Sequence, residues 1–130
     1  MTDPAAPRIA VIEDDPDYLL MMQDVLHNEG YQPLLWTEPL AAITSVTVEQ
    51  PNLVMLSIWF GGQPLGTTVL RAIKESPQTS HIPVILVSGD QKFLNDIALN
   101  IQALCAAIVI KPFAIDELLE AITRALAAAG

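Results

Sequence analysis

The chain of 130 residues suffices for one domain with its own hydrophobic core, since 52% of its residues are hydrophobic. Its net charge of −9, from 6 basic and 15 acidic residues, argues against nucleic-acid binding by this domain, which requires clustered Lys and Arg. The apolar residues come in short blocks, which excludes a membrane span, and the initial MTDPAAPR lacks the pattern of a secretory signal. We therefore expect a cytoplasmic protein.

Short apolar segments alternate along the chain with segments of helical spacing. The first, RIAVIE, ends in acids, after which Asp15 fits the N-cap and Pro16 the first position of a helix that Gly30 stops. Continued in chain order, the pattern predicts strands over 8–13, 31–35, 53–58, 83–87 and 106–110. It predicts helices over about 16–29, 38–48, 67–75, 91–104 and 114–128. The second of these helices is predicted although it contains many β-branched residues, which disfavour helix.

Strands that alternate with helices imply an α/β fold with a doubly wound parallel sheet and right-handed crossovers. In such sheets the ligand crevice lies at the carboxyl ends of the strands. These ends supply two carboxylates, two hydroxyls and one ammonium, from Glu13, Asp14, Ser57, Ser88 and Lys111. Carboxylate oxygens suit Mg²⁺, and Lys and hydroxyl groups hydrogen-bond phosphate oxygens. The strand ends therefore predict a site for a divalent cation and a phosphoryl group.

Four segments together resemble the receiver domain of two-component response regulators, over about residues 7–128: IAVIEDDPD, NLVMLSIWF, HIPVILVSG and IVIKPF. The resemblance implies a flavodoxin-like (βα)5 fold with strand order 2-1-3-4-5. We accordingly expect an N-terminal tail over 1–6 and a receiver-like domain over 7–130.

The resemblance also implies roles for individual residues. Glu13 and Asp14 match the acidic pair that binds Mg²⁺, and Trp59 matches the position whose backbone carbonyl completes the metal shell. Ser88 matches the hydroxyl, and Lys111 the lysine, that contact the phosphoryl group. The bond between Lys111 and Pro112 matches a cis peptide of the family.

Ser57 falls where the family places its phosphoaccepting aspartate. A carboxylate is already a nucleophile at neutral pH, whereas a serine hydroxyl needs a base to remove its proton. A phosphoserine ester also lacks the lability of an acyl phosphate. We therefore expect the usual phosphorelay chemistry to fail and Mg²⁺ to bind weakly. We further expect a direct contact between Lys111 and Asp14 at rest, and Asp15 to be a helix cap and not a third metal ligand.

Ile108 marks a second departure from the family. It stands three residues before the lysine, at the switch position where the family commonly carries Tyr or Phe. An aliphatic side chain fills the groove there but cannot make the aromatic swing or a phenolic hydrogen bond. The loop GGQPLG after the third strand also differs from the family's turn.

These departures predict an atypical receiver domain in phosphorelay-type signal transduction, one that is not an enzyme and acts mainly through phosphorylation-independent contact with other proteins. The expected partners are a histidine kinase, an output domain or another regulator. The resemblance implies a homodimer surface formed by the fourth helix, the fifth strand and the fifth helix.

Alternative interpretations stay open at this point. A serine kinase would phosphorylate Ser57 and place added charge beside Lys111 as the switch. A phosphorylated small molecule, or Mg²⁺ with an anion, would bind without a covalent bond among Asp14, Ser57, Ser88 and Lys111. The plainest interpretation gives Ser57 and Lys111 no chemical role. Ser57 is then a hydroxyl that is hydrogen-bonded within the fold, and Lys111 is a counter-ion to the acids.

Overall fold

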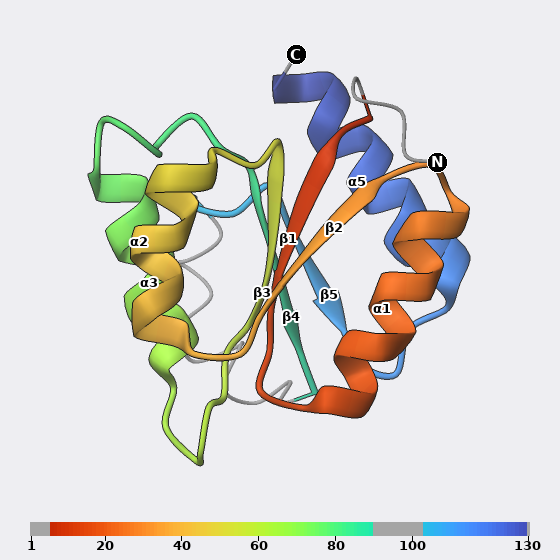
Figure 1. Ribbon diagram of the computed structural model, residues 1–130, viewed down its shortest axis with the longest axis horizontal. Coiled ribbons are helices and arrows are strands. Elements are labelled where there is room, and N and C mark those ends of the chain that lie inside the picture. The colour runs from red at the N-terminus through yellow and green to blue at the C-terminus, as the bar shows by residue number, and fades with distance from the viewer. Residues whose placement is uncertain (1–5, 90–102, 130) are drawn as a thin grey trace.

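The computed structural model describes residues 6–89 and 103–129, and short strands within these ranges form a five-stranded parallel sheet (Figure 1). The strands are β1 (Arg8–Ile12), β2 (Gln32–Trp36), β3 (Leu53–Ser57), β4 (Val84–Ser88) and β5 (Ala107–Ile110). They lie in the order β2-β1-β3-β4-β5, and neighbouring strands are parallel. The predicted flavodoxin-like fold and its strand order are therefore confirmed.

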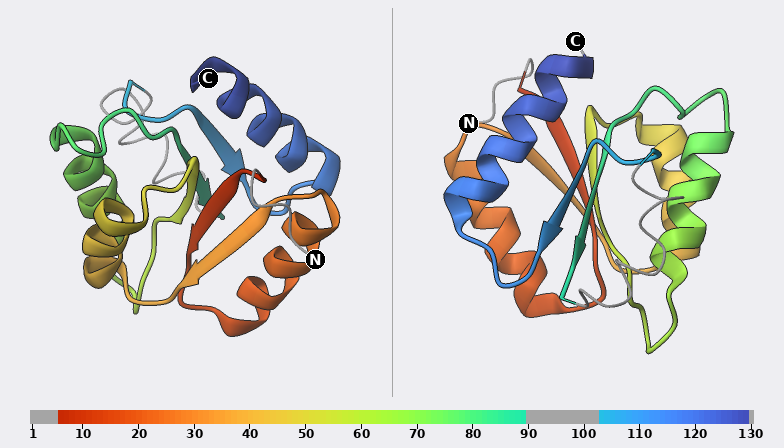
Figure 2. Two further views of the ribbon diagram at one scale, coloured as in Figure 1. Left: turned by 45° about the horizontal axis from the view of Figure 1, so that its top comes forward. Right: turned by 180° about the vertical axis from the view of Figure 1, so that it is seen from behind.

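Helices cover both faces of the sheet. One face carries α1 (Pro16–Asn28) and α5 (Ile115–Ala129), and the other carries α2 (Pro39–Glu49) and α3 (Leu65–Glu75), as Figure 2 shows. The helix predicted over 91–104 lies outside the described residues, except for Ala103 and Leu104, which form a turn.

The start and end of α1 follow the predicted signals. The Asp15 side chain caps the helix by accepting a hydrogen bond from the Asp17 N–H at 3.0 Å, and Pro16 is its first residue. A cap of this kind satisfies one of the backbone donors that a helix leaves unpaired at its start. After the helix, Gly30 has a φ of +85°, a conformation that favours glycine. The role of Asp15 as a helix cap is thereby confirmed.

The helix α2 forms in spite of its β-branched residues because packing and capping support it. At the start of the helix, the Glu38 side chain accepts a hydrogen bond from the Leu40 N–H at 3.1 Å. The Thr47 hydroxyl donates to the carbonyl of Ile43, one turn earlier, so this polar group is satisfied within the helix. Val46, fully buried, joins the core beneath the helix. Tertiary contacts thus outweigh the intrinsic preference against helix.

The helix α3 begins at Leu65, two residues before the predicted start near Thr67. Its first turn lies directly against the end of β3, where the Gly66 N–H donates to the Ile58 carbonyl at 2.8 Å. A Cβ atom on Gly66 would stand 2.0 Å from the backbone oxygen of Ser57. Only glycine fits so close a backbone approach, so Gly66 fixes the distance between α3 and the strand that carries Ser57.

Each face of the sheet has its own core, and the central strands β3 and β4 are buried over their whole length. The core on the side of α2 and α3 includes Ile12, Val46, Leu56, Ile73 and Leu86. The core on the side of α1 and α5 includes Val11, Met22, Met55, Leu118 and Ile122. Both central strands end in a buried serine, Ser57 and Ser88, so polar groups occupy the carboxyl edge of an otherwise apolar sheet.

Replacing Gly66 with alanine should destabilise the fold by about 3 kcal/mol, because the new methyl group would overlap the β3 backbone. The free energy of unfolding in urea measures the effect. Gly89→Ala is the matched control, since the nearest atom to a Cβ there is the Lys111 Cβ at 3.8 Å, an ordinary contact. Equal effects of the two substitutions would contradict the close approach at Gly66.

Candidate functional site

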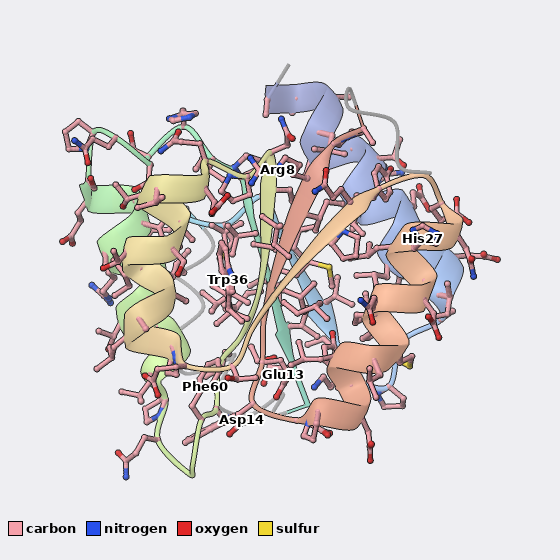
Figure 3. The ribbon with its side chains drawn as sticks, in the orientation of Figure 1. Arg8, Glu13, Asp14, His27, Trp36 and Phe60 are labelled. Atoms are coloured by element: carbon pink, nitrogen blue, oxygen red, sulfur yellow. The ribbon has the colours of Figure 1, made fainter. Side chains whose placement is uncertain are left out.

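Parallel pairing brings the predicted site residues together at the carboxyl edge of the sheet. Ile12 pairs with Leu56 in the register of β1 and β3, so the next residues, Glu13 and Ser57, lie side by side. At the other central strand, the Lys111 N–H donates to the Ser88 carbonyl at 2.9 Å. Figure 3 shows Glu13 and Asp14 at the lower end of the sheet, opposite the end that carries Arg8.

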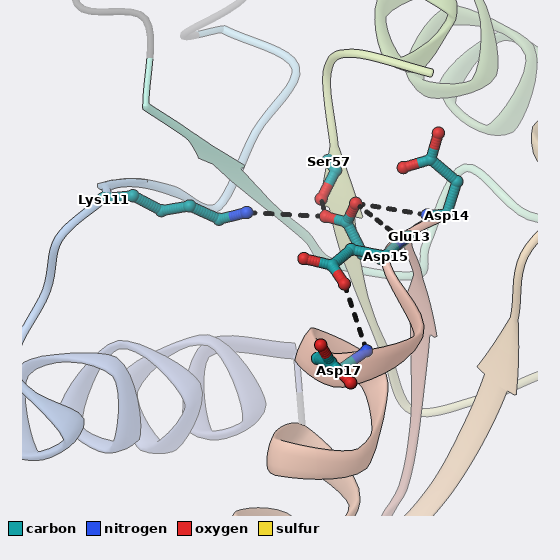
Figure 4. A network of polar contacts seen from close by, with 6 residues as sticks. All are labelled: Glu13, Asp14, Asp15, Asp17, Ser57 and Lys111. Carbon is teal, nitrogen blue, oxygen red and sulfur yellow. Dashed lines mark hydrogen bonds and ion pairs between the residues drawn. The ribbon is translucent and has the colours of Figure 1, made fainter. Parts of the chain in front are cut away.

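The Glu13 carboxylate is the centre of this site and is only 4% exposed. One oxygen, Oε1, accepts hydrogen bonds from the N–H groups of Asp14 and Asp15, at 3.1 and 3.3 Å. The other, Oε2, accepts a short hydrogen bond from the Ser57 hydroxyl and pairs with the Lys111 ammonium at 3.5 Å (Figure 4). A buried carboxylate needs such compensation, because its unpaired charge would be costly away from water.

The Lys111 ammonium contacts Glu13, and the predicted contact with Asp14 is wrong. Asp14 is exposed and points away from the lysine, and its Oδ2 accepts a hydrogen bond from the Gly61 N–H at 3.2 Å. The parallel register explains the difference, because Glu13 is the residue that lies next to Ser57, inside the strand end. The peptide bond between Lys111 and Pro112 is cis, which confirms the prediction for that bond.

Tyr18, in the first turn of α1, is a member of this site that the sequence analysis missed. The Lys111 nitrogen lies 4.2 Å from the centre of the Tyr18 ring, which is a cation–π contact. The Tyr18 hydroxyl is buried and has no hydrogen-bond partner among the described residues. Burial raises the pKa of Tyr18 well above its usual range, and the negative charge of Glu13 acts in the same direction. The signal that could have found Tyr18 is the helix start at Pro16, which places the next residues beside the strand ends.

A hollow of about 170 Å³ lies at this strand edge, lined by Glu13, Ser57, Ile58, Trp59, Val87, Ser88, Gly89 and Lys111. It therefore brings together most of the residues predicted for a phosphoryl site. Asp14 does not line the hollow, and neither does Ile108, which packs against the core on the side of α2 and α3. Trp59 is half-buried at the hollow, whereas Ser57 and Ser88 are buried in its wall.

Comparison with known proteins assigns this arrangement to a family. The model of the response regulator receiver domain matches residues 9–123. The chain is 30% identical to the chemotaxis protein CheY of Bacillus subtilis, over 93% of this chain and 98% of that protein. It is 32% identical to the nitrogen assimilation regulatory protein NtrX of Azorhizobium caulinodans, over 91% of this chain. The chain thus belongs to the response regulator receiver domain family, whose members serve two-component signalling.

The solved structures give the same fold. The receiver domain of the sensor histidine kinase PA1611 from Pseudomonas aeruginosa, which has a magnesium ion in its active-site cleft, superimposes with a TM-score of 0.84 at 20% identity. That likeness covers 95% of this chain and 99% of the other. The chain spans only 26% of the length of NtrX. No helix within the described part of the chain is long and apolar enough to cross a membrane.

Receiver domains commonly bind Mg²⁺, and the donor atoms of this site can be tested against such an ion. Both oxygens of Glu13 are already engaged: Oε1 accepts two backbone hydrogen bonds, and Oε2 accepts one from Ser57 and pairs with the Lys111 ammonium. Among residues 6–89 and 103–129, no group of three or more His, Cys, Asp or Glu side chains could hold a metal ion. Asp14 offers an exposed carboxylate, one oxygen of which accepts a hydrogen bond from the Gly61 N–H. In this arrangement the residues do not fit a preformed Mg²⁺ site, and weak binding stays a prediction.

Replacing Tyr18 with phenylalanine should raise the free energy of unfolding by about 1 kcal/mol, because it removes a buried hydroxyl that lacks a partner. Thermal and urea unfolding at neutral pH measure the change. Tyr31→Phe is the control and should bring no gain, since its hydroxyl is not among the buried groups without a partner. A loss of stability in Tyr18→Phe would show that the hydroxyl has a partner after all.

Proposed function

We propose that this chain is an atypical receiver module in phosphorelay-type signalling, with Ser57 in place of the phosphoaccepting aspartate. It acts mainly by protein–protein contact and without aspartyl phosphorylation. The observation that carries the proposal is the hydrogen bond from the Ser57 hydroxyl to Glu13, at the end of the central strand β3. In this contact the hydroxyl at the acceptor position donates to the acidic residue, so each satisfies the other. Ser57 has no carboxylate that could attack a phosphoryl donor.

The surroundings of Ser57 also do not favour its use as a nucleophile. A serine needs a base, and the adjacent Glu13 carboxylate is already engaged by Lys111 and two backbone N–H groups besides Ser57. Ser57 is only 6% exposed and lies within a buried strand, so an external serine kinase could not take it up as an extended substrate. These two features favour a structural hydroxyl over the kinase-controlled switch.

The electrostatics of the pocket support a single resting state. In a site with three carboxylates, a divalent cation and a lysine are needed to offset the charge. Here Lys111 and three other donors already compensate Glu13, and Asp14 faces solvent. A conformational equilibrium shifts only when a ligand distinguishes two states, and an aspartyl phosphate has no attachment point at Ser57. We therefore assign control of this module to a partner protein.

Receiver domains interact with kinases and with output domains, and they are generally non-enzymatic signalling modules. For this chain we propose a histidine kinase, an output domain or another regulator as the partner, and no catalytic activity of its own. The net charge of −9 supports a protein over a nucleic acid as the direct partner of this domain.

Titration of the amide NMR spectrum with Mg²⁺ and beryllofluoride tests the proposal. We expect no saturable response at the strand ends in the wild-type protein. Ser57→Asp should restore the response and bind Mg²⁺ at least about tenfold more tightly, since one added ligand worth about 1.4 kcal/mol has that effect.

Ser57→Asn is the matched control, because asparagine has the shape of aspartate without its charge, and it should stay silent. A saturable response of the wild-type protein to Mg²⁺ and beryllofluoride would contradict the proposal. A response of the wild-type protein to inorganic phosphate alone would favour non-covalent anion binding instead.

A further inference from the structure

The Lys111 ammonium lies close to two groups, the Glu13 carboxylate and the Tyr18 ring. Its nitrogen lies 3.5 Å from Glu13 Oε2 and 4.2 Å from the centre of the Tyr18 ring. Its side chain is 35% exposed, so solvent weakens the ion pair, which is also long for a direct hydrogen bond. The ion pair alone therefore does not hold this flexible side chain in one place.

The Tyr18 ring supplies the second restraint. The ring is anchored, because it packs against the core that α1 and α5 share and its hydroxyl is buried. An aromatic face attracts a cation most strongly where water is partly excluded. Tyr18 does not line the hollow formed by Ser57, Ser88 and Lys111. A cation seated on the Tyr18 ring is consequently held toward α1, the helix that carries the ring.

We propose that Tyr18 is a positioning residue for Lys111, which keeps the ammonium at the α1 side of the pocket in the resting state. An anion that enters between Ser57 and Ser88 then competes with the ring for Lys111. This inference deepens the proposed function, since it concerns the same pocket, and it rests on the proposal that the pocket has one resting state. Its first test reads the lysine without any ligand, so its failure is distinct from a failure of the proposed function.

The first test is the NMR signal of the Lys111 ε-methylene protons in protein with ¹³C-labelled lysine. The chain has three lysines, Lys74, Lys92 and Lys111, and Lys111→Arg assigns the signal by its loss. Protons above an aromatic face are shielded, so we expect an upfield shift in the wild-type protein. Tyr18→Phe keeps the ring and should keep the shift, whereas Tyr18→Leu should abolish it.

A Lys111 signal at the position of a solvent-exposed lysine in the wild-type protein would overturn the inference, as would a shift that survives in Tyr18→Leu. Nuclear Overhauser contacts between the Lys111 ε-protons and the Tyr18 ring protons give a second measurement in the wild-type protein. They keep the test decisive if Tyr18→Leu fails to fold, because their absence would also overturn the inference.

The competition between ring and anion is tested in the Ser57→Asp background. There Tyr18→Leu should bind beryllofluoride about threefold more tightly than Tyr18→Phe, because a ring no longer holds the lysine. Equal affinities would show that Lys111 serves the anion without leaving the ring, and would contradict the competition. The two variants both lack the Tyr18 hydroxyl, so the comparison isolates the ring.

Discussion

The rest of the site depends on the burial of one charge, the carboxylate of Glu13 at the end of β1. A carboxylate that is 4% exposed must be compensated inside the protein, and here four donors do so. Two of them are the N–H groups of Asp14 and Asp15, which lead into α1. The others are Ser57, from β3, which pairs with β1 in the sheet, and Lys111, from the loop after β5. One acid thereby ties together the first helix, the central strand and the C-terminal part of the sheet.

This arrangement gives the serine at the end of β3 a structural meaning. A hydroxyl can donate one hydrogen bond to Glu13, whereas an ionised carboxylate in the same place could only accept and would repel it. In our proposal the site with serine needs no metal ion at rest. The serine brings no negative charge of its own, and its hydroxyl donates a hydrogen bond to the charge on Glu13. The tight packing of Gly66 against the backbone of Ser57 adds a steric limit to any movement of this strand end.

The sequence predicted the fold, and which residues lie at the site, more completely than it predicted the contacts among those residues. The alternation of apolar and helical segments identified the parallel sheet, because burial on both faces leaves a clear pattern in β3 and β4. The same rule placed Glu13, Ser57, Ser88 and Lys111 at one edge. It could not tell which acid Lys111 would contact, since that depends on strand register and side-chain rotamers. It missed Tyr18 because an aromatic residue in a helix commonly belongs to the core, and its ring indeed does. The start of α3 at Leu65 was missed because Pro64 and Gly66 indicate a loop in sequence, whereas the contact with β3 requires glycine there.

A double-mutant cycle between Ser57→Ala and Glu13→Ala tests most directly whether the buried carboxylate organises the pocket through Ser57. The free energies of unfolding in urea, measured at pH 7 for the wild-type protein, both single variants and the double variant, give the coupling between the two side chains. The account predicts a favourable coupling of about 1.5 kcal/mol or more, as for a hydrogen bond to a charged group. Additive effects, within about 0.5 kcal/mol, would mean that Ser57 and Glu13 do not depend on each other and would contradict the account.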